Sequence, residues 1–218
     1  MSLDKEIQEQ YHKRMDKSHL YNSVYSILSD QERHLKVKEI MKGYADENKT
    51  ILEIGAGQGS NVPLLLECGF SLDRIFLNEL LQERIASAKA KYPSIVLYEG
   101  DALKLDITQK FDCVFQSTVF TSILDDNDRQ KLAGKMWELL KPGGVILWYD
   151  FIYNNPKNPD VKKVSIPEVK KLFPKALRHH ISRITLAPPV GRLVGKLYPL
   201  FNVPFLRSHI LAVFQKGS

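Results

Sequence analysis

Residues 51–61 read Ile51-Leu52-Glu53-Ile54-Gly55-Ala56-Gly57-Gln58-Gly59-Ser60-Asn61. The apolar residues around Glu53 predict the end of a buried strand, and three glycines at alternate positions predict a tight turn. Asn61 or Ser60 stands where a following helix would be capped, with Pro63 in its first turn. Glycines have no Cβ to hold a ligand off the backbone, and a helix start offers free N–H groups to an anion. The stretch therefore predicts a site for a nucleotide-type cofactor.

The spacing of the glycines distinguishes between cofactors. A dinucleotide site has the spacing G-x-G-x-x-G, and its third glycine position is Ser60 here. A phosphate-binding loop would need Gly-Lys-Ser/Thr, which is absent from the stretch. The pattern resembles the first motif of class I S-adenosylmethionine (SAM)-dependent methyltransferases, in which an acidic residue, here Glu53, precedes G-x-G-x-G by two positions. An ordinary glycine turn between a strand and a helix is the alternative interpretation.

Length and composition are those of an ordinary globular protein of 218 residues, which favours one domain. No run reaches the roughly 18 apolar residues of a membrane span, and the first residues lack the apolar core of a signal peptide. Cys68 and Cys113 fall on a predicted helix and a predicted strand, which favours buried thiols and a cytoplasmic location over a disulfide. No cluster of Cys and His has zinc spacing, so we expect no metal.

The charge is distributed unevenly along the chain. Residues 1–150 contain 19 Lys and Arg against 23 Asp and Glu, whereas residues 151–218 contain 12 against 2. Such asymmetry can indicate contact with an anionic partner, although a solvated basic face is the alternative. A predicted helix after Pro189 also places apolar residues on one face. We expect that face to cover an anionic or lipid-like acceptor, to rest on a membrane surface, or to pack on the sheet. It consists of Leu193, Val194, Leu197, Leu200 and Phe201.

Strands and helices alternate regularly after the glycine loop. Helices of about 10–15 residues between apolar strands predict βαβ units and a parallel sheet. Capping boxes at 29–32 and 165–168 predict two helix starts, and residues 141–144 predict a turn. The predicted strands are 74–78, 95–98, 112–115, 145–149, 180–186 and 209–214, and the main predicted helices are 63–67, 80–91 and 128–140.

The resemblance completes the expected fold. It implies a single α/β domain with a Rossmann-like, doubly wound, seven-stranded sheet that is mostly parallel with an antiparallel last strand. Within this single methyltransferase domain, residues 1–48 form a helical N-terminal cap, residues 49–150 bind SAM, and residues 151–218 face the acceptor.

The resemblance also extends to residues that follow the next strands. Glu79 lies where a carboxylate accepts the ribose hydroxyls, and Asp101-Ala102 lies where the family binds adenine. Gln116 follows the fourth strand and faces the methionine end, and residues 140–144 match a structural turn of the family. The implied cofactor is S-adenosyl-L-methionine, with S-adenosyl-L-homocysteine as product and no metal. The implied cofactor-binding residues are Glu53, Gly55, Ala56, Gly57, Gly59, Asn61, Glu79, Leu80, Asp101, Ala102, Leu103, Gln116 and Ser117.

The acceptor side is less clearly marked. Strand ends point into the ligand crevice of such sheets, so Asp150 is the preferred catalytic base, with Tyr153 and the pair His179-His180 as other candidates. The expected substrate-binding residues are Tyr21, Thr121 and Tyr153. The chain most resembles methyltransferases of the ubiquinone/menaquinone-biosynthesis type. Many of these have a His pair where Thr121-Ser122 stands, which argues against a quinone-type acceptor.

The predicted function is transfer of a methyl group from SAM to an O, N or C atom of a small-molecule acceptor. A nucleic-acid (RNA) methyltransferase is an alternative that the basic last third supports. The absence of an Asn/Asp-Pro-Pro-Tyr/Phe motif after the fourth strand argues against nucleic acid as a partner. A nicotinamide-dependent oxidoreductase and a non-catalytic SAM-binding protein are further alternatives. The sequence leaves the acceptor and the oligomeric state undefined.

Overall fold

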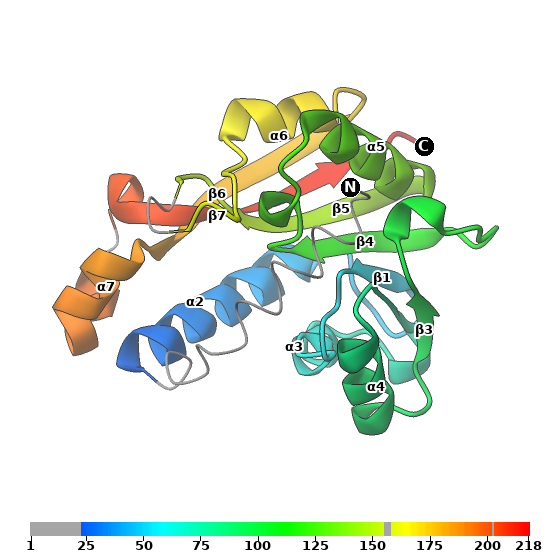
Figure 1. The fold of residues 1–218 in the computed structure, drawn as a ribbon, viewed down its shortest axis with the longest axis horizontal. Helices are drawn as coiled ribbons and strands as arrows, with labels where there is room; N and C mark the ends of the chain where they lie inside the picture. The colour runs from blue at the N-terminus through cyan, green and yellow to red at the C-terminus, as the bar shows by residue number, and fades with distance from the viewer. Residues whose placement is uncertain (1–22, 155–157, 202) are drawn as a thin grey trace.

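One seven-stranded sheet organises the chain (Figure 1). The computed structural model describes residues 23–154, 158–201 and 203–218. The strand order is β3-β2-β1-β4-β5-β7-β6; the pairs from β3 to β5 are parallel, and β7 is antiparallel to both neighbours. This confirms the predicted Rossmann-like sheet. The strands are β1 (Ile51–Ile54), β2 (Ile75–Glu79), β3 (Val96–Glu99), β4 (Phe111–Ser117), β5 (Leu140–Phe151), β6 (Arg178–Leu186) and β7 (Arg207–Gln215).

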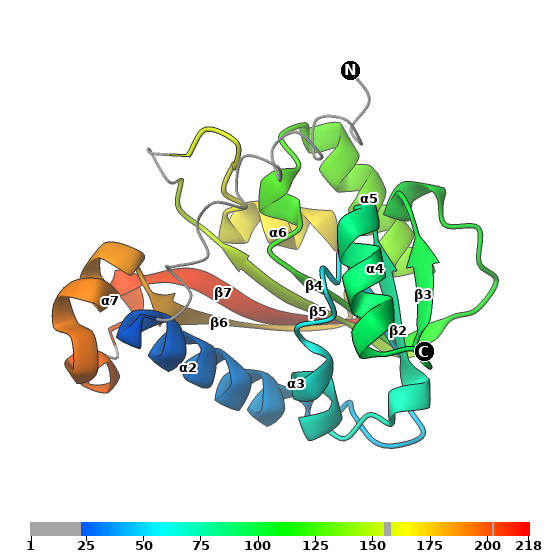
Figure 2. The ribbon, with the colours of Figure 1, turned by 60° about the horizontal axis from the view of Figure 1, so that its bottom comes forward.

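Helices cover both faces of the sheet. Figure 2 shows α2 and α3 on one side of it and α5 and α6 on the other. Short 3₁₀ turns follow several strands. The α-helices are α2 (Val24–Met41), α3 (Val62–Glu67), α4 (Gln82–Lys91), α5 (Asp126–Glu138), α6 (Ile166–Leu172) and α7 (Pro188–Val194), and the 3₁₀ turns are η2 (Leu72–Arg74), η3 (Ala102–Lys104), η4 (Phe120–Ser122), η5 (Gly195–Leu200) and η6 (Pro204–Leu206).

The core is divided between the two faces of the sheet. Successive side chains of a strand point to opposite faces. On β5, therefore, Ile146 and Trp148 pack with α5 and α6, whereas Val145 and Leu147 pack with α2 and α3. Burial on both faces explains why the central strands are almost continuously apolar. It also makes the single acid of β1, Glu53, conspicuous, because its side chain is fully buried.

The order of the strands determines where a ligand can bind. The chain continues from β1 to β2 and β3 on one side and then adds β4 and β5 on the other side of β1. In such sheets, ligands bind outside the carboxyl ends of the strands, at the point where the order reverses. The glycine loop follows β1 and therefore lies at this point.

The N-terminal helix differs from the prediction. The capping box predicted a new helix at Ser29, but α2 begins at Val24 and continues unbroken through this position. Ser23 caps it, because its Oγ accepts a hydrogen bond from Ser26 N at 3.1 Å. Ser29 Oγ instead donates to Ser26 O at 3.0 Å, one turn back. The predicted start at Ser29 is therefore wrong.

Tertiary partners of Glu32 explain this difference. Its carboxylate accepts hydrogen bonds from Thr185 N at 2.9 Å and from the Tyr198 hydroxyl at 2.6 Å, and it also pairs with Arg207. These groups belong to β6, η5 and the start of β7. Glu32 thus fixes α2 across the end of the sheet instead of closing a capping box. The second box is confirmed, since Ser165 and Glu168 cap α6 reciprocally.

Two further expectations differ from the structure. The helix predicted after Pro189 ends at Val194, because Gly195 adopts a φ of 54° and the chain continues as a 3₁₀ turn containing Pro199. The apolar face expected to continue along this helix is consequently broken. Residues 141–144 do not form a separate turn but begin β5, with a register shift opposite Phe111 and Cys113.

Some expectations fall outside the described residues, namely the first 22 residues of the helical cap predicted over 1–48 and the role of Tyr21. Within the part of the chain that the structure describes, no helix has the length and apolar character needed to cross a membrane.

Candidate active site

The glycine loop connects β1 to α3 through backbone conformations that favour glycine. The φ values of Gly55, Gly57 and Gly59 are 66°, 60° and 71°. A Cβ on Gly55 would lie 2.5 Å from Val119 Cγ2, so the loop packs closely on the segment after β4. A Cβ on Gly57 would meet nothing nearer than Arg84 Nη1 at 3.9 Å. Only the end of the flexible Arg84 side chain lies within contact of this position, so a ligand can approach the backbone of Gly57.

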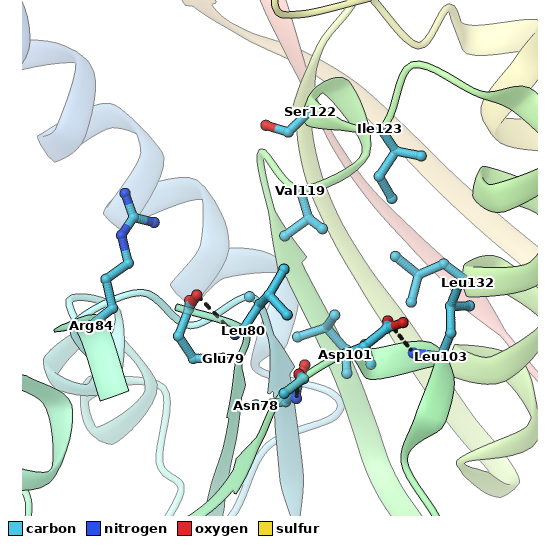
Figure 3. A pocket seen from close by; sticks show the side chains of 14 residues that line it. Asn78, Glu79, Leu80, Arg84, Asp101, Leu103, Val119, Ser122, Ile123 and Leu132 are labelled. Carbon is cyan, nitrogen blue, oxygen red and sulfur yellow. Dashed lines mark hydrogen bonds between the residues drawn. The ribbon is translucent and has the colours of Figure 1, made fainter. Parts of the chain in front are cut away.

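A cavity opens beside this loop, at the carboxyl ends of β1, β2 and β3 (Figure 3). Glu79 and Asp101 border it, with Leu80 between them, Leu132 close to Asp101, and Val119 and Ile123 farther along the wall. Two carboxylates among apolar side chains suit a ligand with hydroxyl or amino groups and an apolar ring.

Glu79, the last residue of β2, fixes the loop. Its side chain is buried, and Oε2 accepts a hydrogen bond from Gly57 N at 2.6 Å. Oε1 accepts from Leu80 N at 2.9 Å and from Leu81 N at 3.0 Å. A carboxylate has about four acceptor positions, so one remains for a ligand hydroxyl. Glu79 thus has a structural role in the loop beside the ribose-binding role that the resemblance implies.

Asn78 connects the neighbouring strand ends. Its Nδ2 donates to Tyr98 O at 3.0 Å and to Gly100 O at 2.9 Å, and its backbone oxygen accepts from Ala56 N at 2.9 Å. These bonds hold the glycine loop, β2 and the end of β3 together. Sequence reasoning missed Asn78, since an amide at a strand end has no pattern of its own.

Asp101 begins the short turn η3 beside the cavity. Its Oδ1 accepts a hydrogen bond from Leu103 N at 2.9 Å, and its Oδ2 lies 3.5 Å from Lys104 Nζ. The cap directs the chain so that Ala102 and Leu103 form part of the cavity wall, with Leu80 also lining the cavity. The predicted residues of this part of the site therefore lie together.

Glu53 lies beneath the loop with its carboxylate fully buried. Oε1 accepts a hydrogen bond from Asn61 Nδ2 at 2.6 Å, whereas Oε2 has no hydrogen-bond partner among the described residues. Burial raises the pKa of Glu53 to about 7. Asn61 holds the first position before α3, but its side chain bonds Glu53 and makes no cap hydrogen bond, contrary to the prediction. A buried carboxylate oxygen without a partner is suited to an incoming cation or ammonium group.

Arg33 of α2 extends this group and was missed by sequence reasoning. Its Nη1 donates to Asn61 Oδ1 at 2.9 Å, and its guanidinium carbon lies 5.4 Å from the centre of the Tyr149 ring. Arg33 and Asn61 are 28 residues apart, so no local pattern could have connected them. The glycine loop is consequently flanked by a buried acid and a largely buried guanidinium.

The residues after β4 have structural contacts as well. Gln116 is fully buried; its Oε1 accepts from Val119 N at 3.0 Å and its Nε2 donates to Tyr149 O at 3.3 Å. These bonds position the segment that contacts Gly55. Ser117 ends β4 and is half-buried. The methionine-facing role of Gln116 and Ser117 remains a prediction.

Asp150 is buried within the sheet end and does not line the cavity. Its Oδ1 accepts from Thr121 Oγ1 at 2.8 Å and from Phe151 N at 2.9 Å, and its Oδ2 accepts from Thr121 N at 3.2 Å. Burial raises the pKa of Asp150 to about 7. The two residues predicted for catalysis and acceptor binding, Asp150 and Thr121, therefore contact each other. Their chemical roles remain predictions.

The other acceptor-side candidates lie apart. Tyr153 is exposed, and its hydroxyl accepts from Arg183 Nη1 at 3.3 Å. His179 and His180 lie on the exposed part of the edge strand β6, away from the cavity. A histidine that the sequence analysis did not select, His209, stacks on Tyr149 with ring centroids 5.1 Å apart. Burial lowers the pKa of His209 to about 4, so its ring is neutral at pH 7.

No group of three or more His, Cys, Asp and Glu side chains in residues 23–154, 158–201 and 203–218 could hold a metal ion.

Comparison with known proteins shows which proteins the chain resembles. Residues 51–144 match the profile of a family described as a methyltransferase domain. Over 134 residues the chain is 29% identical to a malonyl-[acyl-carrier protein] O-methyltransferase of Calditerrivibrio nitroreducens. That match covers 62% of this chain and 49% of the relative, so the chain matches about half the relative's length.

Solved structures show the same fold. The N-methyltransferase NodS from Bradyrhizobium japonicum, in complex with S-adenosyl-L-homocysteine, superimposes with a TM-score of 0.73 at 15% identity, over 98% of this chain and 99% of that one. A putative sarcosine dimethylglycine methyltransferase from Galdieria sulphuraria gives a TM-score of 0.62 at 16% identity, over 86% of each chain.

The fold is therefore the one seen in Rossmann-like methyltransferases. Residues 51–144 carry the match to a methyltransferase domain, and the chain resembles class I SAM-dependent methyltransferases that act on small molecules.

Proposed function

We propose that the protein transfers the methyl group of SAM to an oxygen, nitrogen or carbon atom of a small-molecule acceptor. The observation that carries the proposal is the open backbone at Gly57, which Glu79 holds beside a cavity bordered by Asp101. This is the place in the sheet where a doubly wound fold binds its ligand.

The residues fit SAM on three counts. The cavity offers Glu79 and Asp101 to hydroxyl and amino groups, and its apolar walls suit a base ring. Gly57 leaves room for close approach to the loop. The partnerless Oε2 of Glu53 suits the ammonium of the methionine end, and Arg33 stands nearby to attract its carboxylate.

The work of the protein is positioning. Bound SAM supplies a methyl group on a positively charged sulfur, which an acceptor displaces in line. The chain's own residues orient the two reactants and exclude water, the main contribution that this chemistry needs from a protein. Val119 and Gln116 fix the segment after β4 against the glycine loop. We assign acceptor binding to the side formed by the N-terminal region and residues 151–218, with Thr121, Tyr153 and Tyr21 as candidates.

An acceptor that loses a proton needs a base, and Asp150 is our candidate. Its raised pKa of about 7 suits a group that exchanges protons near neutral pH. In the described structure it is hydrogen-bonded to Thr121, so access to it requires that contact to open. A carboxylate acceptor would need no base at all.

An anionic or lipid-like acceptor is the class we favour. The excess of basic residues in 151–218 supports it, as does the relative whose name specifies malonyl on an acyl carrier protein. The comparisons lend no support to an RNA methyltransferase. We also propose a cytoplasmic location, which the free thiols of Cys68 and Cys113 favour.

The test is calorimetric titration with SAM, S-adenosylhomocysteine and NAD, followed by methyl transfer from labelled SAM to acidic and neutral small molecules. Gly57→Val should abolish SAM binding, because its side chain occupies the ligand's space. Gly195→Val is a matched control: Gly195 also has a positive φ and open surroundings, but lies far along the chain in η5. Unchanged SAM binding by Gly57→Val, or a preference for NAD, would refute the proposal. SAM binding without transfer to any acceptor would favour a non-catalytic SAM-binding protein.

A further inference from the structure

Four large apolar side chains are exposed at one end of the molecule. Figures 1 and 2 show α7, η5 and η6 together there, beyond the ends of β6 and β7. The exposed fractions are 86% for Leu193, 56% for Leu197, 77% for Leu200 and 72% for Phe205. We call these four residues the outer patch. Soluble surfaces rarely gather large apolar side chains, so the outer patch indicates a contact surface.

The inner side of the same segment is firmly held. Tyr198 is buried, donates its hydroxyl hydrogen to Glu32 and accepts from Leu186 N at 3.1 Å. Gly191 is buried against Tyr25, so closely that a Cβ there would lie 2.2 Å from the Tyr25 ring. The Tyr25 and Tyr198 rings are themselves 6.1 Å apart. The outer patch therefore stands on an anchored support and is not the exposed side of an unpacked loop.

The charges within the segment that carries the outer patch are of one sign, and Glu32 of α2, which contacts this segment, is paired with Arg207. Arg192 and Lys196 alternate with its leucines and are exposed. Residues 169–218 contain nine Lys and Arg and no Asp or Glu. Apolar side chains that project from a basic surface are complementary to a lipid layer with anionic head groups. An acidic protein partner would match the charge equally, but a solvent-exposed apolar group on a projecting segment is suited to insertion among head groups.

We propose that the outer patch, with Arg192 and Lys196, docks the protein on an anionic membrane surface. The leucines and Phe205 enter the head-group layer while the two cations contact lipid phosphates. This concerns where the protein works and is independent of the methyl-transfer proposal, since lipid binding is measured without SAM.

The experiment is flotation of the full chain with phosphatidylcholine vesicles that contain or lack phosphatidylglycerol. The wild type should bind only the anionic vesicles, and more strongly at low salt. Arg192→Gln with Lys196→Gln should weaken binding by about fivefold per cation, or roughly 25-fold together. Leu193→Ser combined with Leu200→Ser should weaken it by at least about tenfold, because binding scales with the inserted apolar area.

Matched controls separate this role from general surface effects. Leu35 and Leu177 are exposed by 68% and 67% but lie elsewhere, so Leu35→Ser with Leu177→Ser should bind vesicles like the wild type. The exposed pair Lys42 and Lys91 provides a charge control with the same loss of net charge. Calorimetric SAM titration and a thermal melt should be unchanged in the patch variants.

Three results would overturn the proposal. These are failure of the wild type to float with anionic vesicles, wild-type vesicle binding by both patch variants, and equal losses in the control pairs. Sedimentation equilibrium tests whether the outer patch instead binds a second copy of the chain. If the wild type is a dimer that dissociates in Leu193→Ser with Leu200→Ser, the outer patch is a dimer interface and the membrane proposal is wrong.

Discussion

Replacing Glu79 by alanine tests the cofactor site most directly, because this side chain has both a loop contact and a proposed ligand contact. Three backbone N–H groups donate to its carboxylate, from Gly57, Leu80 and Leu81. Leu80 and Leu81 are only half-buried, so water can replace the carboxylate there. The Gly57 N–H lies closest, at 2.6 Å, and its bond connects the loop to β2.

The loop contact predicts a loss of folding stability, and the proposed ligand contact predicts a loss of affinity for SAM. A hydrogen bond to a charged group contributes about 1.5–3 kcal/mol, so losing the Gly57 contact should lower the free energy of unfolding by about 2 kcal/mol. For a chain of this size, that corresponds to a fall in Tm of about 4–8 °C. Loss of the ribose contact should weaken SAM binding by another 1–3 kcal/mol or so, roughly five- to 150-fold in Kd.

The assays are a thermal melt without ligand and calorimetric titration with SAM. Glu79→Gln is informative, since its amide retains an acceptor for Leu80 and Leu81 but turns a donor toward the Gly57 N–H. Glu83→Ala removes an exposed carboxylate four residues away and should change neither quantity. If Glu79→Ala lowers Tm but leaves the Kd for SAM within twofold, Glu79 is a loop anchor only and the ribose assignment fails.

Three further predictions concern the other buried or cavity-lining acids. Asp101→Ala should reduce the affinity for SAM with little change in the ligand-free Tm; a large fall in Tm with unchanged titration would show that its cap of η3 is its only role. Because burial raises the folded-state pKa of Glu53 from 4.5 to about 7, the folded chain binds more protons than the unfolded chain between these values, and stability should fall as pH rises through this window. SAM binding should strengthen across the same window as Glu53 ionises beside the ligand's ammonium, and Glu53→Gln should remove both trends; a pH dependence that persists in this variant would contradict the assignment. Asp150→Asn should lower kcat by about 100-fold or more if Asp150 is the base, with the Kd for SAM unchanged; a loss of Tm at normal kcat would leave it as a support for Thr121.

Much of the fold could be predicted because its signals are local. The glycine stretch, the apolar strands and the Ser165–Glu168 box each depend on neighbours in sequence, and the structure agrees with them. The strand order is not local; the resemblance supplied only the type of sheet, with seven strands and an antiparallel last strand. The helix start predicted at Ser29 was wrong because distant contacts override the local pattern of the capping box. Glu32 has stronger partners more than 150 residues away.

The site residues likewise differ in whether the local sequence marks them. Residues at strand ends, such as Glu79 and Asp101, were predictable because the loop after each parallel strand reaches one edge of the sheet. Arg33 was not, since its contacts with Asn61 and Tyr149 arise only when α2 packs across the sheet. The sequence left open whether Leu193 and Leu200 are exposed, because an apolar face on a helix can also pack inward.

Glu32 and Arg33 are consecutive residues on α2, and they reach in different directions. Glu32 accepts hydrogen bonds from Thr185 and Tyr198 at the far end of the sheet, while Arg33 donates one to Asn61 beside the glycine loop. A rigid helix transmits any displacement at one residue to the next, so loading of the cofactor side and order on the acceptor side should be linked, and the linkage must be reciprocal. We expect added SAM to slow hydrogen exchange at the Thr185 amide. We also expect an acceptor to tighten SAM binding by the same factor by which SAM tightens acceptor binding.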